Sequence, residues 1–346
     1  MKIEDKNIGP NEPTFIIAEL SANHMNDFDV AVKTIEAMAE AGADAVKFQT
    51  YTPDTITIDC DNEYFQIKQG TIWDGQVLYD LYEDAYMPWE WQPKLKKIAE
   101  DLGLIAFSSP FDKTSVDFLE EMDVPAYKIA SYEITDIPLI EYVARKGKPI
   151  IISTGIASLE DIELAIQTCL DAGNDQIAIL KCTSSYPSPF EEINLNTIPA
   201  LEEKFNVVVG LSDHTMGCEV SIAGVSLGAK IIEKHFVLDR NMDTPDSEFS
   251  MEPQEFKLMV DSIRNVEKAL GNDNFELTEK MIINQDFSRS LFVVTDMKKG
   301  DIISEENVRS IRPGFGLHPK YLNDIIGKKV KRDLKIGTPF ELKFLE

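Results

Sequence analysis

The sequence alternates short apolar segments with longer amphipathic ones, and this alternation constrains the fold more than any other feature. Eight segments are rich in β-branched residues, as strands are: 14–20, 44–50, 104–110, 126–131, 149–155, 177–184, 207–214 and 230–236. The stretch 30–43, which follows the first segment, has apolar residues every three or four positions and stops at Gly42, as an amphipathic helix does. Strands that alternate with helices form parallel sheets.

Eight such units predict an α/β fold of the (β/α)8 TIM-barrel type. An open, doubly wound sheet is the alternative architecture for alternating strands and helices. None of the eight strand segments is followed by the GxGxxG motif that typifies dinucleotide-binding sheets, which favours the closed barrel.

Charge is distributed unevenly along the 346 residues. Residues 288–346 carry 12 Lys and Arg against 8 Asp and Glu, whereas the other 287 residues carry 22 against 52. This asymmetry predicts a barrel domain over 1–275, a linker over 276–287 and a small domain over 288–346. The acidic bulk argues against a nucleic-acid partner, which requires a basic face.

Membrane and export signals are missing from the sequence. No apolar run reaches the 18 residues of a membrane span, and the polar segment 1–13 has no apolar signal-peptide core. The four cysteines are widely spaced and form no CxxC pair, as is common for reduced thiols. We therefore expect a cytoplasmic protein that does not bind membranes.

Each predicted strand ends in polar or charged residues. The segment IIEKHF (231–236) is the most pronounced case, because Glu233, Lys234 and His235 directly follow two isoleucines. Ionised groups taken out of water are costly unless they are paired. In TIM barrels the carboxyl ends of all strands meet at one face, where active sites lie. The polar strand ends therefore predict a catalytic bowl.

One group of strand-end residues suits a small anion. Ammonium and hydroxyl groups converge from several strands, and together they offer the many hydrogen-bond donors that a phosphate accepts. Its members are Lys47, Lys128, Ser131, Ser153, Ser184 and Ser212.

Two histidines suit a divalent metal ion. His214 and His235 end the neighbouring strands seven and eight, and adjacent strands lie about 5 Å apart. Two imidazole ligands leave positions open for water and substrate, as in a catalytic Mn²⁺ or Mg²⁺ site. His24, after the first strand, is a weaker third candidate. Because residues alternate along a strand, Glu233 and His235 share one face and Lys234 lies on the other. We therefore expect a structural role for Lys234.

Several motifs, in this order, resemble the sialic acid synthase family: IAELSANH, GADAVKFQTYTPD, FSSPFD, PAYKIAS, IIISTGIAS, KCTSSYP, VGLSDHT and IIEKHF. The resemblance extends from about residue 13 to the carboxyl terminus. Residues 288–346 are similar to the small SAF domain of that family, which is related to type III antifreeze protein. The resemblance implies condensation of phosphoenolpyruvate with an N-acetylated amino sugar to give a nine-carbon 2-keto acid.

Within the family, LSANH, KFQTYTPDTIT and RPGFGLHPK resemble the pseudaminic acid synthase branch. That branch uses 2,4-diacetamido-2,4,6-trideoxy-altrose. Ser21 stands where N-acetylneuraminate synthases usually have glycine, and Ser184 stands where they have asparagine. N-acetylneuraminate and legionaminate synthases are the alternatives within the family.

The resemblance also implies roles for individual residues. Glu19, His214 and His235 would be catalytic, and the two histidines would hold Mn²⁺, Mg²⁺ or Co²⁺. The six anion-binding residues named above would bind phosphoenolpyruvate, whereas Gln49, Tyr186 and Asp246 would contact substrate. Arg312 would reach the site from the SAF domain of the other subunit in a domain-swapped homodimer. The aromatic-rich stretch 73–91 would either suit a less polar sugar or pack a long loop.

Two functions from other classes remain as alternatives. A Schiff-base aldolase lyase could use Lys128 or Lys181 as its nucleophile on the same barrel. A non-catalytic carbohydrate- or ice-binding protein would fit the last 59 residues alone, but it leaves the polar strand ends unexplained.

Overall fold

The computed structural model describes residues 1–68, 70 and 72–346. The chain divides into two compact units, Met1–Gly271 and Asn272–Glu346, which are described separately below. Among the described residues, no helix has both the length and the apolar character that a membrane crossing requires.

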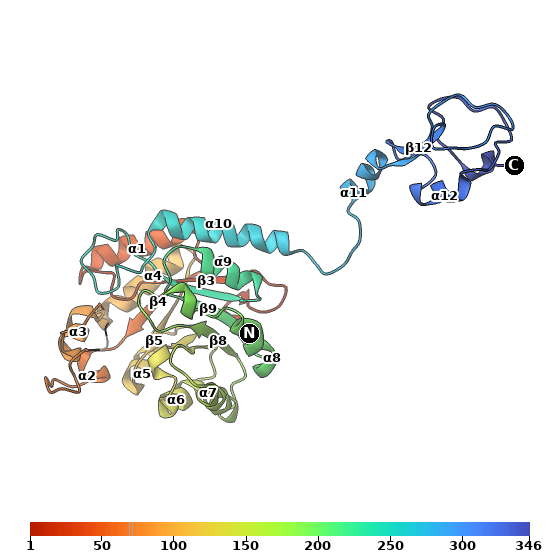
Figure 1. Ribbon diagram of the computed structural model, residues 1–346. Coiled ribbons are helices and arrows are strands. Elements are labelled where there is room, and N and C mark those ends of the chain that lie inside the picture. Colours follow the sequence, from red (N-terminus) through yellow and green to blue (C-terminus); the bar gives the residue numbers. More distant parts are fainter. Residues whose placement is uncertain (69, 71) are drawn as a thin grey trace. The chain divides into compact units, whose positions relative to one another are not determined.

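The first unit is a closed parallel barrel, as predicted (Figure 1). Within the described residues eight strands form it, namely β3 (Phe15–Glu19), β4 (Ala45–Thr50), β5 (Ile105–Pro110), β6 (Tyr127–Ile129), β7 (Ile150–Ser153), β8 (Ile177–Cys182), β9 (Val208–Asp213) and β10 (Ile231–His235). Strand β10 pairs with β3 to close the sheet, in a register that sets His235 opposite Glu19. The TIM-barrel prediction is confirmed.

Helices alternate with the strands and lie around the barrel (Figure 1). They are α1 (Phe28–Ala41), α2 (Pro53–Ile56), α3 (Leu78–Ala85), α4 (Gln92–Asp101), α5 (Lys113–Glu121), α6 (Ile137–Ala144), α7 (Leu159–Asp171), α8 (Thr197–Phe205), α9 (Glu219–Ser226) and α10 (Pro253–Leu270). Local sequence explains their limits. The Asp27 carboxylate caps α1, and Gly42 ends it with φ of 90°, a left-handed angle that glycine adopts without penalty.

The barrel core is apolar because its strands are covered on both sides. Ile16, Ile151 and Ile231 are all fully buried. A short amino-terminal hairpin, β1 (Lys2–Ile3) with β2 (Lys6–Asn7), adds Ile3 to this core. Polar side chains are buried chiefly at the carboxyl ends of the strands, which is where the candidate site forms.

The second unit has a separate small core. Strands β11 (Ser290–Val293) and β12 (Val308–Ile311) pair antiparallel. Helix α12 (Leu322–Ile325) contributes Ile325 to a cluster that includes Phe340 and Phe344. Helix α11 (Glu279–Asn284) lies in the segment predicted as a linker. An independent core is what a separately folding domain requires.

Candidate active site

Four charged side chains meet at the carboxyl ends of β3, β4, β6 and β10. The Lys47 Nζ lies 2.8 Å from Glu19 Oε2 and 3.5 Å from Glu233 Oε2. The Lys128 Nζ lies 3.3 Å from Glu233 Oε1, and no side chain of the four is more than 5% exposed. Mutual pairing explains how Glu233 can lie in an apolar strand. A buried charge left without its partner costs about 3–5 kcal/mol, and the two lysines remove that cost.

The two carboxyl groups of this cluster differ in their pKa. Burial raises the pKa of Glu19 to about 7, although Lys47 opposes the shift. Burial acts on Glu233 as well, but Lys128 and Lys47 together outweigh it and lower the pKa of Glu233 to about 2. At neutral pH Glu233 is therefore a fixed negative charge, whereas Glu19 can exchange a proton, as a general acid or base must.

A hydroxyl-lined cradle adjoins the charged cluster. The Gly155 N–H donates to Ser131 Oγ at 3.1 Å, and Ser212 Oγ donates to Glu233 Oε1 at 3.0 Å. A Cβ at Gly155 would stand 2.1 Å from Ser184 Oγ, so only glycine allows these hydroxyls to converge. The buried Ser153 Oγ has no hydrogen-bond partner among the described residues. Such a group suits an anion that supplies the missing acceptor.

His214 and His235 lie side by side, as their neighbouring strands predict. Their ring centroids are 5.3 Å apart. The His214 Nδ1 is 3.2 Å from the Thr183 carbonyl oxygen, which favours a proton on Nδ1 and leaves Nε2 free. His235 Nδ1 is buried without a hydrogen-bond partner in the described part of the chain. Burial, together with the charge of His214, lowers the pKa of His235 well below its usual value.

These features fit a divalent metal ion. A buried, neutral imidazole with an unpartnered nitrogen is a competent metal ligand. Among the described residues, no group of three or more His, Cys, Asp or Glu side chains is arranged to hold a metal. His24 therefore does not complete a triad with the pair. Two histidines alone would leave most coordination positions to substrate and water, as an open catalytic site requires.

An aromatic wall covers the histidine pair. The Tyr186 ring lies 4.5 Å from His214, and the Phe249 ring lies 4.9 Å from His235. Trp73 extends the wall, because its ring lies 5.6 Å from Tyr186 and its Nε1–H donates to the Pro245 carbonyl. Of the aromatic residues in 73–91, Trp73 thus reaches the site. In contrast, Trp89 packs on Phe118.

Asp246 is held at the site by the segment that connects β10 to α10. Asn23 anchors this segment, since it donates to the Phe236 carbonyl and accepts from Thr244 Oγ1. The Asp246 carboxylate accepts a hydrogen bond from Ser21 and lies 3.7 Å from His235 Nδ1. Gln49 donates to both Ser21 Oγ and Glu19 Oε1 at 3.0 Å. Predicted residues from three separate segments thus form one connected network.

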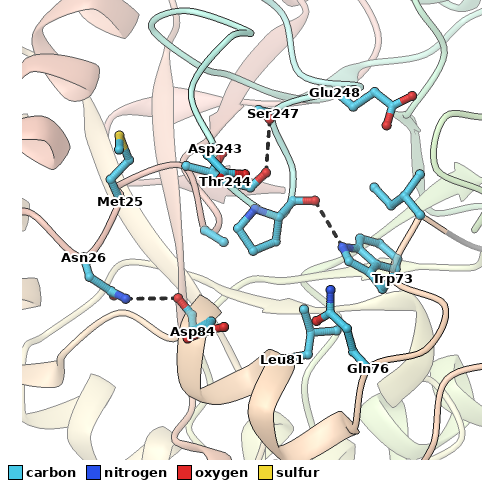
Figure 2. Close-up of a pocket in the computed structure, with 13 residues that line it drawn as sticks. Met25, Asn26, Trp73, Gln76, Leu81, Asp84, Asp243, Thr244, Ser247 and Glu248 are labelled. Atoms are coloured by element: carbon cyan, nitrogen blue, oxygen red, sulfur yellow. Dashed lines mark hydrogen bonds between the residues drawn. The ribbon is translucent and has the colours of Figure 1, made fainter.

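A cavity of about 570 Å³ borders the same segment (Figure 2). Figure 2 shows the Trp73 side chain hydrogen-bonded to the Pro245 carbonyl along one wall and Asn26 bonded to the Asp84 carbonyl along another. Asp84, Asp243 and Glu248 give the lining an acidic character. The cavity shares Trp73 with the aromatic wall over the histidines.

Sequence reasoning missed three residues of this site. Glu233 had no assigned role, although its parity with His235 was recognised. Burial raises the pKa of Glu133 to about 7, so this residue is a second carboxyl able to hold a proton near neutral pH. It follows β6 in a single turn of 3-10 helix (Ser131–Glu133), a place that no periodicity marks. The third is Ser21, whose contacts are described above.

Two other predicted residues of the barrel unit, Lys234 and Lys181, lie outside the charged cluster. Lys234 pairs with Asp213 at 2.9 Å, both side chains being fully buried, in agreement with a structural role. The Lys181 Nζ donates to the Cys182 carbonyl at 2.7 Å and to Thr183 Oγ1 at 3.0 Å. Arg312 directly follows β12 in the second unit and is exposed.

His24 packs as a structural residue. Its Nδ1 accepts from the Asn26 N–H at 3.1 Å, and its ring meets the Trp91 ring edge-on at 5.9 Å. Burial lowers the pKa of His24 to about 4. Because its usual value of 6.5 applies to the unfolded chain, the unfolded state binds a proton first as the pH falls. The neutral ring therefore stabilises the fold above pH 6.5, and this contribution is lost progressively toward pH 4.

We expect the free energy of unfolding to fall by about 2 kcal/mol more between pH 7 and pH 5 in the parent protein than in His24→Gln, which does not titrate. Urea unfolding at the two pH values measures this difference. The comparison cancels the titration of other groups. An equal pH dependence in both proteins would show that His24 is not buried in its neutral form.

The chain is similar to known proteins in both sequence and structure. The family model described as "NeuB family" matches residues 34–275, and the model described as "SAF domain" matches residues 288–346. A pseudaminic acid synthase of Campylobacter jejuni is 48% identical over 331 residues, which is 96% of either chain. One from Helicobacter pylori is 45% identical over 97% of this chain and 98% of its own.

A solved structure is also similar to this chain. The N-acetylneuraminic acid (sialic acid) synthetase of Leptospira borgpetersenii, in complex with citrate, superposes with a TM-score of 0.74 at 32% identity. The match covers 82% of this chain and 94% of that one.

Proposed function

The chain belongs to the NeuB family, and on this premise we propose that it is a pseudaminic acid synthase. The enzyme is a phosphoenolpyruvate-dependent transferase that makes a nonulosonic acid. Carbon 3 of phosphoenolpyruvate bonds to the aldehyde carbon of 2,4-diacetamido-2,4,6-trideoxy-altrose, and the aldehyde oxygen takes up a proton. Water adds to carbon 2 and loses one proton, which gives a tetrahedral intermediate. Phosphate then leaves with its bridging oxygen and the electron pair of that C–O bond, while the hydroxyl on carbon 2 loses its proton and becomes the keto group.

The observation that carries this proposal is the position of an anion-binding cluster beside an open histidine pair. With Glu233 ionised and Glu19 partly protonated, the two lysines leave the cluster with a net positive charge. The rest of the barrel is strongly acidic, so this local charge is what attracts an anionic substrate. An anion and an aldehyde are the two reactants that the site has to join.

We assign phosphoenolpyruvate to the lysine and hydroxyl groups. Lys47 and Lys128 would pair with its carboxylate and phosphate, and both are already desolvated, so their attraction is little screened by water. Ser153 would gain the hydrogen-bond partner that it lacks. Ser131, Ser184 and Ser212 complete the cradle and would also bind phosphoenolpyruvate through their hydroxyl groups.

We assign the sugar aldehyde to the histidine side of the bowl. A divalent ion bound there would supply Lewis acidity to the carbonyl oxygen. His214 and His235 would hold it through the nitrogens that the protein leaves free. Tyr186 and Phe249 exclude water from the rings, which strengthens every polar interaction made there.

Two carboxyl groups are suited to move the protons of the reaction. Glu19 and Glu133 both have a pKa of about 7, so each can hold or release a proton at neutral pH. Gln49 donates to Glu19 Oε1 and thereby fixes the orientation of that carboxyl group. One carboxyl can protonate the aldehyde oxygen while another accepts the proton of the attacking water.

We also propose that two chains share each site in a domain-swapped homodimer. The net charge of +4 over residues 288–346 suits docking on an acidic barrel. Apolar side chains in the connecting segment support an additional interface, since Phe275 is fully exposed and Ile283 and Phe287 are about two-thirds exposed. The four cysteines are free thiols, as is usual in the reducing cytoplasm, the location we propose.

The test of function is phosphate release from phosphoenolpyruvate with a panel of amino sugars. We expect kcat/KM for the 6-deoxy diacetamido sugar to exceed that for N-acetylmannosamine by about 10²-fold or more, because a pocket shaped for a methyl group leaves a hydroxyl unpartnered. Comparable values would assign the chain to the neuraminate branch. A preference for a diacetamido sugar of another configuration would assign it to the legionaminate branch.

A second arm separates the Schiff-base alternative. Borohydride reduction in the presence of pyruvate traps an imine on Lys128 or Lys181 if either is a nucleophile. We expect no trapped adduct by mass spectrometry, because Lys128 is ion-paired with Glu233 and the Lys181 ammonium is held by the Cys182 carbonyl and Thr183 Oγ1. A covalent adduct at either lysine would overturn the proposed mechanism.

A further inference from the structure

Ser21 has a backbone conformation that serine rarely adopts. Its φ is 46°, in the left-handed region, and the residue is only 4% exposed. A residue with a Cβ is strained in this region, whereas glycine is not. Strain of this kind persists where the surrounding structure holds it, and it is concentrated at functional sites. Ser21 follows β3 directly after Glu19 and Leu20, at the rim of the candidate site.

The side chain of Ser21 makes contacts that a glycine at this position could not make. Its hydroxyl donates to Asp246 Oδ2 and accepts from Gln49 Nε2. Gln49 in turn contacts Glu19, and Asp246 contacts His235. Ser21 thus links Glu19, through Gln49, with His235, through Asp246.

This hydroxyl changes what Asp246 can offer a ligand. A carboxylate has about four acceptor positions, and Ser21 takes one of the two on Asp246 Oδ2. The Ser21 side chain also fills space beside Asp246 that glycine would leave open. A ligand hydroxyl that approached Oδ2 from the Ser21 side would meet a position already used and little room, whereas a ligand without that hydroxyl would lose nothing.

We propose that Ser21 is a specificity-determining residue, whose hydroxyl supplies to Asp246 the hydrogen bond that a more hydroxylated sugar would supply. The inference rests on the proposed function, because it matches the missing hydroxyl of a 6-deoxy sugar. The enzyme provides in its own chain the group that its substrate lacks.

The test compares Ser21→Gly and Ser21→Ala with the parent enzyme. The two substrates are the 6-deoxy diacetamido sugar and its 6-hydroxy counterpart of the same configuration. We expect Ser21→Gly to reduce the ratio of the two kcat/KM values at least 10-fold, since a pocket discriminates against an isostere that adds one hydroxyl by about 10²-fold. Ser21→Ala removes the hydroxyl but keeps the Cβ, so the ratio should fall less.

Glu4→Gly is the matched control. Glu4 lies in the turn between β1 and β2, has a φ of 49° and is exposed, so the variant relieves backbone strain of the same kind at a place outside the candidate site. Its ratio should equal that of the parent. Equal ratios in the parent and Ser21→Gly would overturn the proposal and leave Ser21 a structural residue.

Binding of the two alditols extends the test to variants that no longer turn over. These reduced sugars cannot react, and calorimetry gives their affinity ratio directly. In Ser21→Gly this ratio should move in the same direction as kcat/KM, and an unmoved ratio would contradict the inference. Failure of the proposed function looks different, because the parent enzyme would then release no phosphate with the 6-deoxy sugar.

Discussion

Replacing His235 with alanine is expected to lower kcat/KM by about 10³-fold or more. The imidazole lies 5.3 Å from His214, centroid to centroid, and its Nδ1 is buried without a hydrogen-bond partner in the described part of the chain. Loss of a Lewis acid at a carbonyl removes several kcal/mol of stabilisation from the transition state, and each 1.36 kcal/mol is tenfold in rate. His214→Ala should have an effect of the same size.

Metal binding gives an independent measurement. Calorimetric titration of the metal-free protein with Mn²⁺ should show about one tight site per chain in the parent enzyme and none in His235→Ala. His318→Ala is the control, because His318 is an exposed histidine of the second unit and should leave both binding and activity unchanged. Full activity of the parent in a rigorously metal-free preparation would exclude the proposed role.

Mixing two weakly active variants, Arg312→Ala and His235→Ala, is expected to restore activity. Arg312 is exposed and, among the described residues, has no ion-pair partner that would hold it elsewhere. The turn that follows it is fixed, since the Gly314 N–H donates to the Asp286 carbonyl and the Gly316 N–H donates to Ser290 Oγ. Loss of a charged hydrogen bond to substrate costs about 1.5–3 kcal/mol, so Arg312→Ala alone should retain about 1–10% of the parent rate.

The symmetry of a swapped dimer decides the outcome of mixing. If Arg312 acts on the partner barrel, each heterodimer has one site with both lesions and one intact site, and it should reach about half the activity of a parent dimer. Arg309→Ala, a neighbouring exposed arginine on β12, should remain fully active by itself. If mass spectrometry shows subunit exchange and activity still does not rise, Arg312 serves its own barrel or none.

Much of the candidate site could be predicted because strand periodicity assigns side chains to faces. The parity of Glu233 and His235 placed both on one side of β10 and Lys234 on the other, and the ion pair of Lys234 with Asp213 agrees with this assignment. Adjacent strands also brought His214 and His235 together, as expected. These inferences need only the two-residue repeat of a strand and the order of strands in a barrel.

Other features have no local signal. The single turn of helix that carries Glu133 and the left-handed backbone of Ser21 follow no repeat, and both depend on neighbours that are distant in sequence. Trp73 also illustrates this limit. It is one of several aromatic residues in 73–91, and its contact with Tyr186 depends on the path of a long loop.

The sequence by itself determined the barrel, the polar face at its carboxyl ends and the family, because apolar periodicity and motif order are local properties of the chain. Only the tertiary structure decided which charges meet. Closure of the barrel pairs β10 with β3 and brings residues more than 200 positions apart into contact, so that Lys47 lies between Glu19 and Glu233. The resulting pKa values depend on burial and on the distances between strands, and neither quantity is encoded by a repeat along the chain.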